Sequence, residues 1–177
     1  MTTWSGGRPL EVLTLALQGE IFALEVAHVR EILDLVAITE VPNSRPFLDG
    51  LINVRGKVVP LADLRHKFGM ERTPPTIDTR IVVIEVEIDG DPTIVGIRAD
   101  KVYEITEIPA SALEETPRIG MRWRPEFIRC VGKRGNDFIV VMDIGRIFSD
   151  VTCDEISTLP NHPPAKLARS TSSIATT

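Results

Sequence analysis

Cysteine and histidine are scarce in this sequence of 177 residues. The two cysteines, Cys130 and Cys153, form no Cys-x-x-Cys pair, and the three histidines, His28, His66 and His162, are isolated from one another. A disulfide framework, a zinc site and a histidine-based catalytic centre all need these residue types at short, defined spacings. We therefore expect two free thiols, no bound metal and no catalytic histidine.

Long apolar runs and clusters of positive charge are also missing. The chain begins MTTWSGGRPLE, without the basic and apolar regions of a signal peptide, and no apolar run approaches the roughly 18 residues of a membrane-spanning helix. The net charge is −5, and lysine and arginine are scattered among acidic residues rather than gathered in a basic stripe. These features predict a soluble, cytoplasmic protein that neither inserts into a membrane nor binds nucleic acid.

Motifs for nucleophilic catalysis or cofactor binding are absent as well. The sequence contains no Gly-x-Ser-x-Gly elbow and no local pattern that would activate a cysteine. The glycines between Gly50 and Gly56 lack the spacing of a phosphate-binding loop. We expect a protein that is not an enzyme, with no catalytic residues and no cofactor.

Short β-strands dominate the predicted secondary structure. β-Branched and aliphatic residues fill six runs, at residues 12–17, 21–25, 57–61, 80–88, 93–97 and 138–142. Glycine-containing gaps at residues 18–20, 89–92 and 134–137 predict hairpin turns. Helical spacing is confined to residues 26–33, 46–51 and 143–149. Many short strands with few helices predict an all-β fold of small barrels or a sandwich.

Three groups of residues recur in the same order along the chain. The first is a hairpin glycine followed by Val-x-Glu-Ile, with Gly19 before residues 29–32 and Gly90 before residues 102–105. The second is an Ile-Thr-Glu-(Val/Ile)-Pro run, at residues 38–42 and 105–109. The third is an Arg-Gly pair before a short Asp-containing run, beginning at Arg55 and at Arg134. Repeated order predicts repeated architecture. We infer two related halves.

The predicted domain organisation follows from this repeat. We expect two β-barrel subdomains at about residues 11–72 and 79–150, and leave open whether strands are exchanged between them. Pro74 and Pro75 favour extended backbone and mark the seam between the halves. Residues 1–10 are expected to form an N-terminal tail, and residues 151–177, rich in Pro, Ser and Thr, a disordered C-terminal tail.

The segment from Asn53 to Leu64 contains the most specific pattern. Gly56 suits a tight turn with positive φ, and Asp63 suits the cap of the turn that follows, so both are explained by local structure alone. Local structure does not explain Arg55 directly before the turn. A guanidinium pairs with carboxylates in a defined planar geometry, which predicts that Arg55 faces an acidic partner.

Together with its flanks, this segment closely resembles the CheW family over about residues 11–149. The similar runs are VREIL, TEVPNSRPFLDG, GLINVRGKVVPLADLRHKFG, VGIRADKVYEI and VMDIGRIF. The resemblance implies two SH3-like five-stranded β-barrels around separate cores, a few short helices, and a hydrophobic groove between the barrels. It implies a non-catalytic adaptor that binds the cytoplasmic tip of chemoreceptors and the regulatory domain of the histidine kinase CheA, in the cytoplasm at membrane-associated receptor arrays.

The resemblance also implies protein-binding residues. The family's receptor-side surface matches Val29 and Ile32 of the expected helix at residues 26–33, and Val102 and Ile105 in the second half. The alternative is that these four aliphatic side chains belong to the core.

A polar pair completes the implied site. Glu31 matches the family's acidic residue, and Arg55 with Gly56 matches its Asn-x-Arg-Gly motif, so Glu31 and Arg55 are expected to form an ion pair near the groove. The alternative is a solvated surface pair without a role in binding.

One position departs from the resemblance. Cys130 stands where the family often has glycine, so packing around it and the kinase-side contacts of the second barrel stay open. Two other functions also stay open: an adaptor of another chemosensory array, such as one that controls pilus motility or a second messenger, and an unrelated small-ligand-binding β-barrel.

Overall fold

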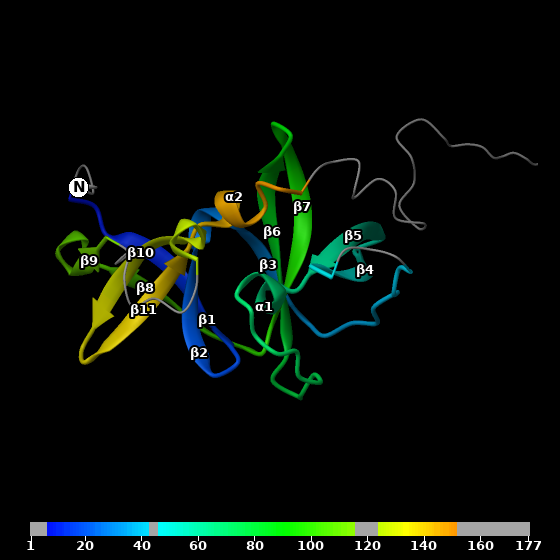
Figure 1. Cartoon of the computed structure of the whole chain (residues 1–177), viewed down its shortest axis with the longest axis horizontal. Helices are drawn as coiled ribbons and strands as arrows, with labels where there is room; N and C mark the ends of the chain where they lie inside the picture. Colours follow the sequence, from blue (N-terminus) through cyan, green and yellow to red (C-terminus); the bar gives the residue numbers. More distant parts are fainter. Residues whose placement is uncertain (1–6, 43–45, 116–123, 152–177) are drawn as a thin grey trace, which may run out of the picture.

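Runs of aliphatic residues form the strands of the computed structural model, which describes residues 7–42, 46–115 and 124–151. The strands form two sheets side by side along the long axis of the molecule (Figure 1). The first sheet has the order β8 (Lys101–Ile108), β1 (Leu10–Leu17), β2 (Glu20–Glu25), β11 (Asp137–Met142), β10 (Ile128–Arg134) and β9 (Leu113–Glu114). The second has the order β3 (Val29–Asp34), β6 (Arg80–Ile88), β7 (Asp91–Ala99), β5 (Lys57–Ala62) and β4 (Leu48–Val54).

Each sheet combines strands from both halves of the chain. The β1–β2 hairpin of the first half pairs with β8 and β11 of the second half. The β6–β7 hairpin of the second half pairs in the same way with β3 and β5 of the first half. The sheets are therefore not the contiguous segments 11–72 and 79–150: the strands are exchanged, because each hairpin buries its apolar face against the opposite half.

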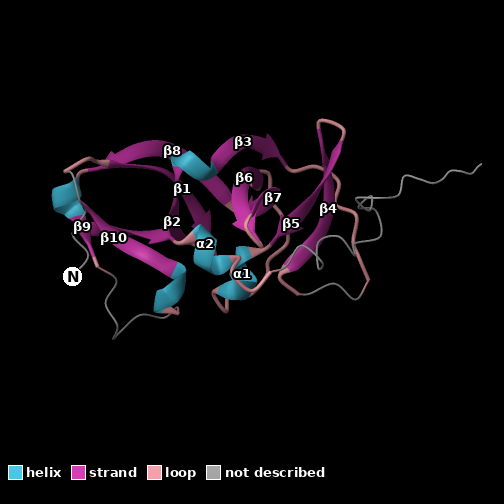
Figure 2. Cartoon of the chain, turned by 90° about the horizontal axis from the view of Figure 1, so that it is seen from above, coloured by secondary structure: helices cyan, strands magenta, loops and turns pink. Residues whose placement is uncertain are grey.

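Helices are short, as expected for this all-β fold. α1 (Leu64–Lys67) and α2 (Ile144–Ile147) lie between the two sheets, and single 3₁₀ turns form η1 (Val26–His28), η2 (Ala110–Ala112) and η3 (Pro125–Phe127) (Figure 2). Asp63 caps α1 by accepting a hydrogen bond from the Arg65 amide at 3.0 Å, and Asp143 caps α2 by accepting one from the Arg146 amide at 3.1 Å. α2 confirms the helix predicted at residues 143–149.

The other two helix predictions were wrong. Residues 26–33 form η1 and then strand β3, and residues 46–51 contain the start of strand β4. Both strands contain a β-bulge, at Val29/Glu31 in β3 and Leu48/Gly50 in β4. A bulge inserts one extra residue, so that apolar residues three apart fall on one face and imitate helical spacing.

All six predicted strands are present, several of them longer than predicted, and hairpins join their partners. The turn residues Gln18 and Gly19 have φ of +52° and +79°, and Asp89 and Gly90 have +53° and +83°. Two positive φ angles match the right-handed twist of the flanking strands, which is why glycine follows a polar residue at these turns. Gly135, in the third predicted turn, has φ of +62°.

Three of the four apolar clusters among the described residues hold the sheets, and the fourth is a small contact of Val41 with Leu51. One fills the inside of the first sheet, around Val12 and Val141, and another fills the inside of the second, around Ile52 and Ile81. The largest lies between the sheets and draws on both halves. The space that the family resemblance describes as a groove is therefore largely packed, and Val29 and Val102 lie at its margin.

Four phenylalanines of this shared core interlock the two halves. Phe47 packs against Phe148 with ring centroids 5.2 Å apart, and Phe127 packs against Phe68 at 6.2 Å. Phe47 and Phe127 occupy equivalent places, because their carbonyls accept hydrogen bonds from the amides of the capping residues Asp63 and Asp143. Each half thus contributes one ring to each contact, as expected for two repeats related by an approximate two-fold axis.

The folded part extends into both predicted tails by one residue. Leu10 is the first residue of β1, and Val151 is only 3% exposed within the shared core. The fold therefore includes residues that the prediction placed in tails of residues 1–10 and 151–177, and the remainder of both tails lies outside the described residues.

Candidate docking surface

Val29 and Ile32 lie on strand β3, an outermost strand of the second sheet. Val29 is opposite Ile84 and Ile32 is opposite Val82, and both partners belong to the shared core. Arg30 is the extra residue of the bulge, so Val29 and Ile32 face the same side although they are three residues apart. Val29 packs against the core, whereas Ile32 is 42% exposed.

Val102 and Ile105 repeat this arrangement on strand β8, an outermost strand of the first sheet. Val102 is opposite Leu15 and Ile105 is opposite Leu13, with a bulge between the two pairs. Val102 packs against the shared core, and Ile105 is 56% exposed. The expectation that these positions are simply core is therefore half right: in each strand the valine is partly buried and the isoleucine faces outward.

The two bulged strands follow one another along the same side of the molecule, away from α1 and α2 (Figure 2). We call the surface formed by Val29, Ile32, Val102 and Ile105 the docking surface. A bulge interrupts the regular row of backbone groups on an outermost strand, which opposes pairing with a further strand. Side chains rather than backbone groups are therefore what this surface offers to a partner.

Glu31 and Arg55 are brought together by the fold, as expected. Arg55 donates from Nε to Glu31 Oε2 at 3.1 Å and from Nη2 to Oε1 at 3.1 Å. The hydrogen bond first, and then the charge of Glu31, raises the pKa of Arg55. Arg55 stands in the β4–β5 turn with φ of +52°, followed by Gly56 at +85°, whose amide donates to the Asn53 side chain at 2.8 Å.

This ion pair connects the two ends of one sheet. β3 and β4 are the outermost strands of the second sheet, so the pair between Glu31 and the β4–β5 turn closes the sheet on itself. The Arg55 side chain is 79% exposed and that of Glu31 is 25% exposed. The pair therefore lies at the surface, and Glu31 is the neighbour of Ile32 on β3.

A second pair of this kind links Glu104 of β8 to Arg134 at the end of β10, with Arg134 Nη2 2.8 Å from Glu104 Oε1. It joins strands near opposite ends of the first sheet, where β10 and β8 approach so closely that a Cβ on Gly132 would lie 2.8 Å from Ile108. Neither Glu104 nor Arg134 is among the predicted site residues. The repeated Val-x-Glu-Ile and Arg-Gly motifs indicated this pair, because Glu104 and Arg134 are the counterparts of Glu31 and Arg55 in the second half.

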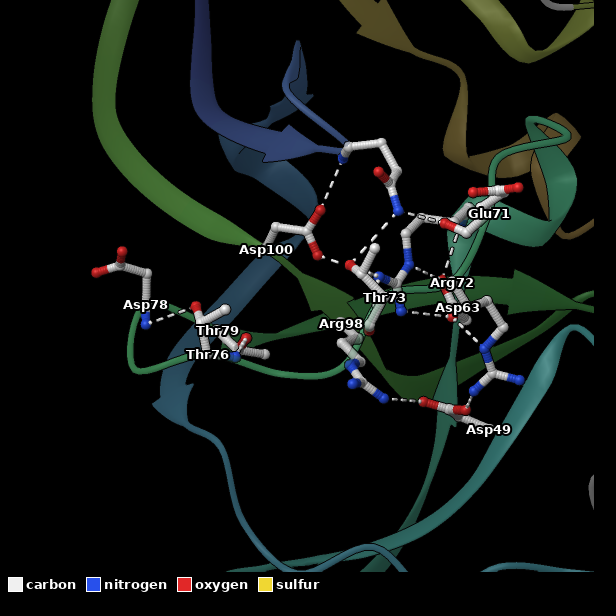
Figure 3. Close-up of polar contacts among 12 residues, drawn as sticks. Asp49, Asp63, Glu71, Arg72, Thr73, Thr76, Asp78, Thr79, Arg98 and Asp100 are labelled. Atoms are coloured by element: carbon white, nitrogen blue, oxygen red, sulfur yellow. Dashed lines mark hydrogen bonds and ion pairs between the residues drawn. The ribbon is translucent and has the colours of Figure 1, made fainter.

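A buried charge network lies at the seam between the halves (Figure 3). Arg65 and Asp63 are 1% and 0% exposed and pair through two hydrogen bonds of 2.9 Å. Burial alone would lower the pKa of Arg65, but the hydrogen bonds and charge of Asp63 outweigh it and raise the pKa. Arg65 also contacts Asp100, which accepts a hydrogen bond from the backbone N–H of Gln18 at 2.7 Å. The network thus ties the β1–β2 turn to α1.

The network continues through a second buried carboxylate, Asp49. It accepts hydrogen bonds from Arg72 and, at 2.9 Å, from Arg98. Burial, followed by the charge of Arg65, lowers the pKa of Arg98. Arg72 reaches Asp63 as well, at 3.0 Å. Because its charges are paired with one another, we assign this network to structure rather than to a reaction.

The described residues contain no group of three or more His, Cys, Asp and Glu side chains that could hold a metal. Within the same ranges, no helix is long and apolar enough to cross a membrane.

Cys130 is a free thiol, 1% exposed, and burial raises its pKa to about 12, so it is a poor nucleophile. Cys153 lies outside the described residues. Aliphatic side chains fill both barrel interiors, which argues against a ligand-binding barrel.

Both the sequence and the fold of this chain are similar to those of known proteins. The CheW-like domain model matches residues 11–152. The chain is 26% identical to "Chemotaxis protein CheW" of Klebsiella aerogenes, over 78% of this chain and 81% of that protein. It is 27% identical to "Protein PilI" of Pseudomonas aeruginosa, over 78% and 72%. The crystal structure of the scaffolding protein TtCheW from Thermoanaerobacter tengcongensis superposes with a TM-score of 0.71 at 26% identity, covering 84% of this chain and 94% of that one.

Proposed function

Because the chain belongs to the CheW-like domain family, we propose that it is a non-catalytic adaptor that couples chemoreceptors to a CheA-type histidine kinase. The observation that carries the proposal is that β3 and β8, two bulged outermost strands on one side of the molecule, carry Val29 with Ile32 and Val102 with Ile105. Relatives with the names CheW and scaffolding protein support it. We further propose that the protein works in the cytoplasm, at receptor arrays.

The chemistry of the docking surface suits a helical partner. Two exposed isoleucines, each beside a half-buried valine, offer apolar contacts that the apolar stripe of an amphipathic helix can cover. The bulges disfavour the other common mode, addition of a strand to the sheet. The chemoreceptor tip, a helical hairpin by the family resemblance, is the occupant that we propose for this surface.

Coupling then requires no reaction. An adaptor that holds a receptor and a kinase in one geometry raises their effective concentration and lets each bias the conformation of the other. The packed shared core suits this role, because it makes the two sheets one body. We propose that the kinase regulatory domain binds elsewhere on the same body, so that both partners are held at once.

A second candidate concerns the array rather than the chemistry. The sequence identity with PilI, 27%, is about the same as the 26% with CheW of Klebsiella aerogenes. That observation supports an adaptor of a different chemosensory array, with the same surfaces but another receptor and kinase. Binding measurements with each receptor and kinase of the source organism would separate the two candidates.

The Glu31–Arg55 pair provides the test of the docking surface. Arg55→Ala and Glu31→Ala should leave the denaturation midpoint near that of the wild type and each weaken binding of a chemoreceptor cytoplasmic fragment about tenfold. The double variant should lose less than the sum of the two, because either single change already breaks the pair. Calorimetric titration with the receptor fragment and, separately, with the CheA regulatory domain measures the affinity for each partner.

Arg80→Ala is the matched control, because Arg80 pairs with Asp34 at the other end of β3. It should bind the receptor fragment as the wild type does. Unchanged receptor affinity of the Arg55→Ala variant would place the functional surface elsewhere, and strict additivity of the two single changes would show that the pair does not act as a unit.

A further inference from the structure

A buried hydroxyl stands directly opposite the bulge of strand β8. Thr14 of β1 is 1% exposed and lies between Leu13 and Leu15, which face Ile105 and Val102. Two residues of β8, Tyr103 and Glu104, therefore lie opposite this one residue of β1. A bulge leaves backbone groups without their regular partners in the ladder.

Thr14 supplies those partners. Its Oγ1 donates a hydrogen bond to the Glu104 carbonyl at 3.0 Å and lies 3.3 Å from the Glu104 amide, which donates to it. One hydroxyl can do both, since it carries a proton and acceptor lone pairs. A methyl group in its place would leave a backbone N–H and C=O at the edge of the core without these bonds.

The bulge in the first half has no such hydroxyl. Val83 of β6 lies between Val82 and Ile84, the residues that face Ile32 and Val29, and it is 2% exposed. The fold therefore accepts valine at this place opposite a bulge. The threonine at position 14 is a specific feature of the first sheet and not a requirement of the architecture.

The residue that Thr14 holds is part of the surface. The Glu104 carboxylate pairs with Arg134, and the side chains of both are more than half exposed, at 60% and 51%. The neighbouring Ile105 belongs to the docking surface and Tyr103 is 48% exposed. The backbone of Glu104 thus determines where a charged pair and an apolar side chain stand at the same edge.

We propose that Thr14 is a positioning residue for the docking surface, and that with Glu104 and Arg134 it sets the affinity of the β8 edge for the receptor helix. The inference rests on the proposed function, since it assigns a role within that same surface. Thr14 never touches the partner. It acts through the Glu104 backbone, which keeps Val102 and Ile105 on one face of β8.

Three single substitutions test the inference. Thr14→Val removes the hydroxyl at nearly constant volume, Thr14→Ser keeps it, and Thr106→Val makes the same change on β8 outside the bulge, at the position opposite Val12. The first readout is hydrogen exchange of the Glu104 amide in the protein alone. Thr14→Val should speed it roughly tenfold, because the amide loses its acceptor, while Thr14→Ser and Thr106→Val should not.

The second readout is affinity for the receptor cytoplasmic fragment and, separately, for the CheA regulatory domain. Thr14→Val should weaken receptor binding roughly fivefold to tenfold and leave kinase binding unchanged, and Thr14→Ser should restore receptor binding. Arg134→Ala should weaken receptor binding similarly, and the Thr14→Val/Arg134→Ala double variant should lose less than the sum.

Two outcomes would overturn the inference. Receptor affinity of Thr14→Val equal to the wild type, in a protein whose Ile105→Asp variant no longer binds, would show that the hydroxyl does not position the surface. Parallel loss of receptor and kinase binding, following the fall in thermal stability, would reduce Thr14 to a stability residue. Failure of the proposed function is distinguishable, because then neither Ile32→Asp nor Ile105→Asp would change receptor binding, whatever the exchange of the Glu104 amide.

Discussion

The two sheets have the same strand order, but the two halves of the chain bury charge differently. Exchanging each strand for its counterpart converts the order β3-β6-β7-β5-β4 into β8-β1-β2-β11-β10. Asp63 and Asp143 cap equivalent helices, yet Asp63 is 0% exposed and pairs with the buried Arg65, whereas Asp143 is 29% exposed and lies 3.7 Å from the exposed Arg146. The helix caps, which both halves share, belong to the repeated fold. The buried Asp63–Arg65 pair, which only the first half has, lies at the seam and holds the two halves together.

The exchange of strands has the largest consequence. Fragments 1–74 and 75–177, produced separately, should each be largely unfolded, because neither contains all the strands of one sheet. Mixed at equal concentration, they should regain the β-sheet circular dichroism and the cooperative unfolding of the whole chain. A cooperative unfolding transition in fragment 75–177 alone would show that the second half is an independent barrel.

The two capping aspartates provide a sharper comparison. Asp63→Ala should reduce the free energy of unfolding by about 3–5 kcal/mol, because it leaves the buried Arg65 without its main carboxylate. Asp143→Ala removes a helix cap at a more exposed place and should cost only about 0.5–2 kcal/mol. Urea denaturation of both variants at one pH measures the difference, and equal losses would mean that the buried network does not stabilise the seam.

Strand content and turns followed from local sequence, and the errors share one cause. The predicted runs and the three glycine turns are present, whereas the helices predicted at residues 26–33 and 46–51 are strands in which a bulge puts residues three apart on one face. β8 and β10 also contain bulges and were missed as strands. A single sequence does not reveal where a strand carries an extra residue, since that depends on its partner strand.

Part of the candidate site was also predictable from the sequence, and part of it depends on which strands pair. The Glu31–Arg55 pair was expected from the family resemblance, and the structure forms it. The contact between Thr14 and Glu104 joins residues 90 positions apart and follows from the exchange of β1 into the sheet of β8. The buried Arg65 was unpredictable for a related reason, because arginine is normally exposed and only the folded seam surrounds it with Asp63 and Asp100.

Gly50 and Cys130 occupy equivalent places after the bulges of β4 and β10, opposite Leu61 and Val141. A Cβ on Gly50 would lie 2.4 Å from the Thr39 carbonyl oxygen, which takes part in the backbone bridge to Leu51. Gly50→Ala should therefore reduce the free energy of unfolding by about 1–3 kcal/mol. Cys130→Ala, which removes one sulfur from a small core, should cost about 1 kcal/mol. Thermal denaturation compares them, and a neutral Gly50→Ala would contradict the close approach.

The thiol of Cys130 should give the second half a pH dependence that the first half lacks at Gly50. Burial raises its pKa from 9.0 to about 12. The unfolded chain loses the thiol proton near the ordinary pKa while the folded protein keeps it, so this contribution to stability is complete below about pH 9 and is lost as the pH rises toward the folded-state value. In a Cys153→Ser background, the difference in unfolding free energy between Cys130 and Cys130→Ala should be constant at neutral pH and shrink above about pH 9.

Alkylation provides the independent measurement. Iodoacetamide reacts with thiolates, so Cys130 in the folded Cys153→Ser variant should stay unmodified at about pH 8 and react promptly once the protein is unfolded in urea. Rapid modification of the native protein would mean that the first sheet opens around β10, the strand that contains this thiol. A stability difference that stays constant to about pH 10 would show that the thiol ionises equally in both states. Either result would make Cys130 equivalent to an exposed residue, and the comparison with the tightly packed Gly50 would no longer hold.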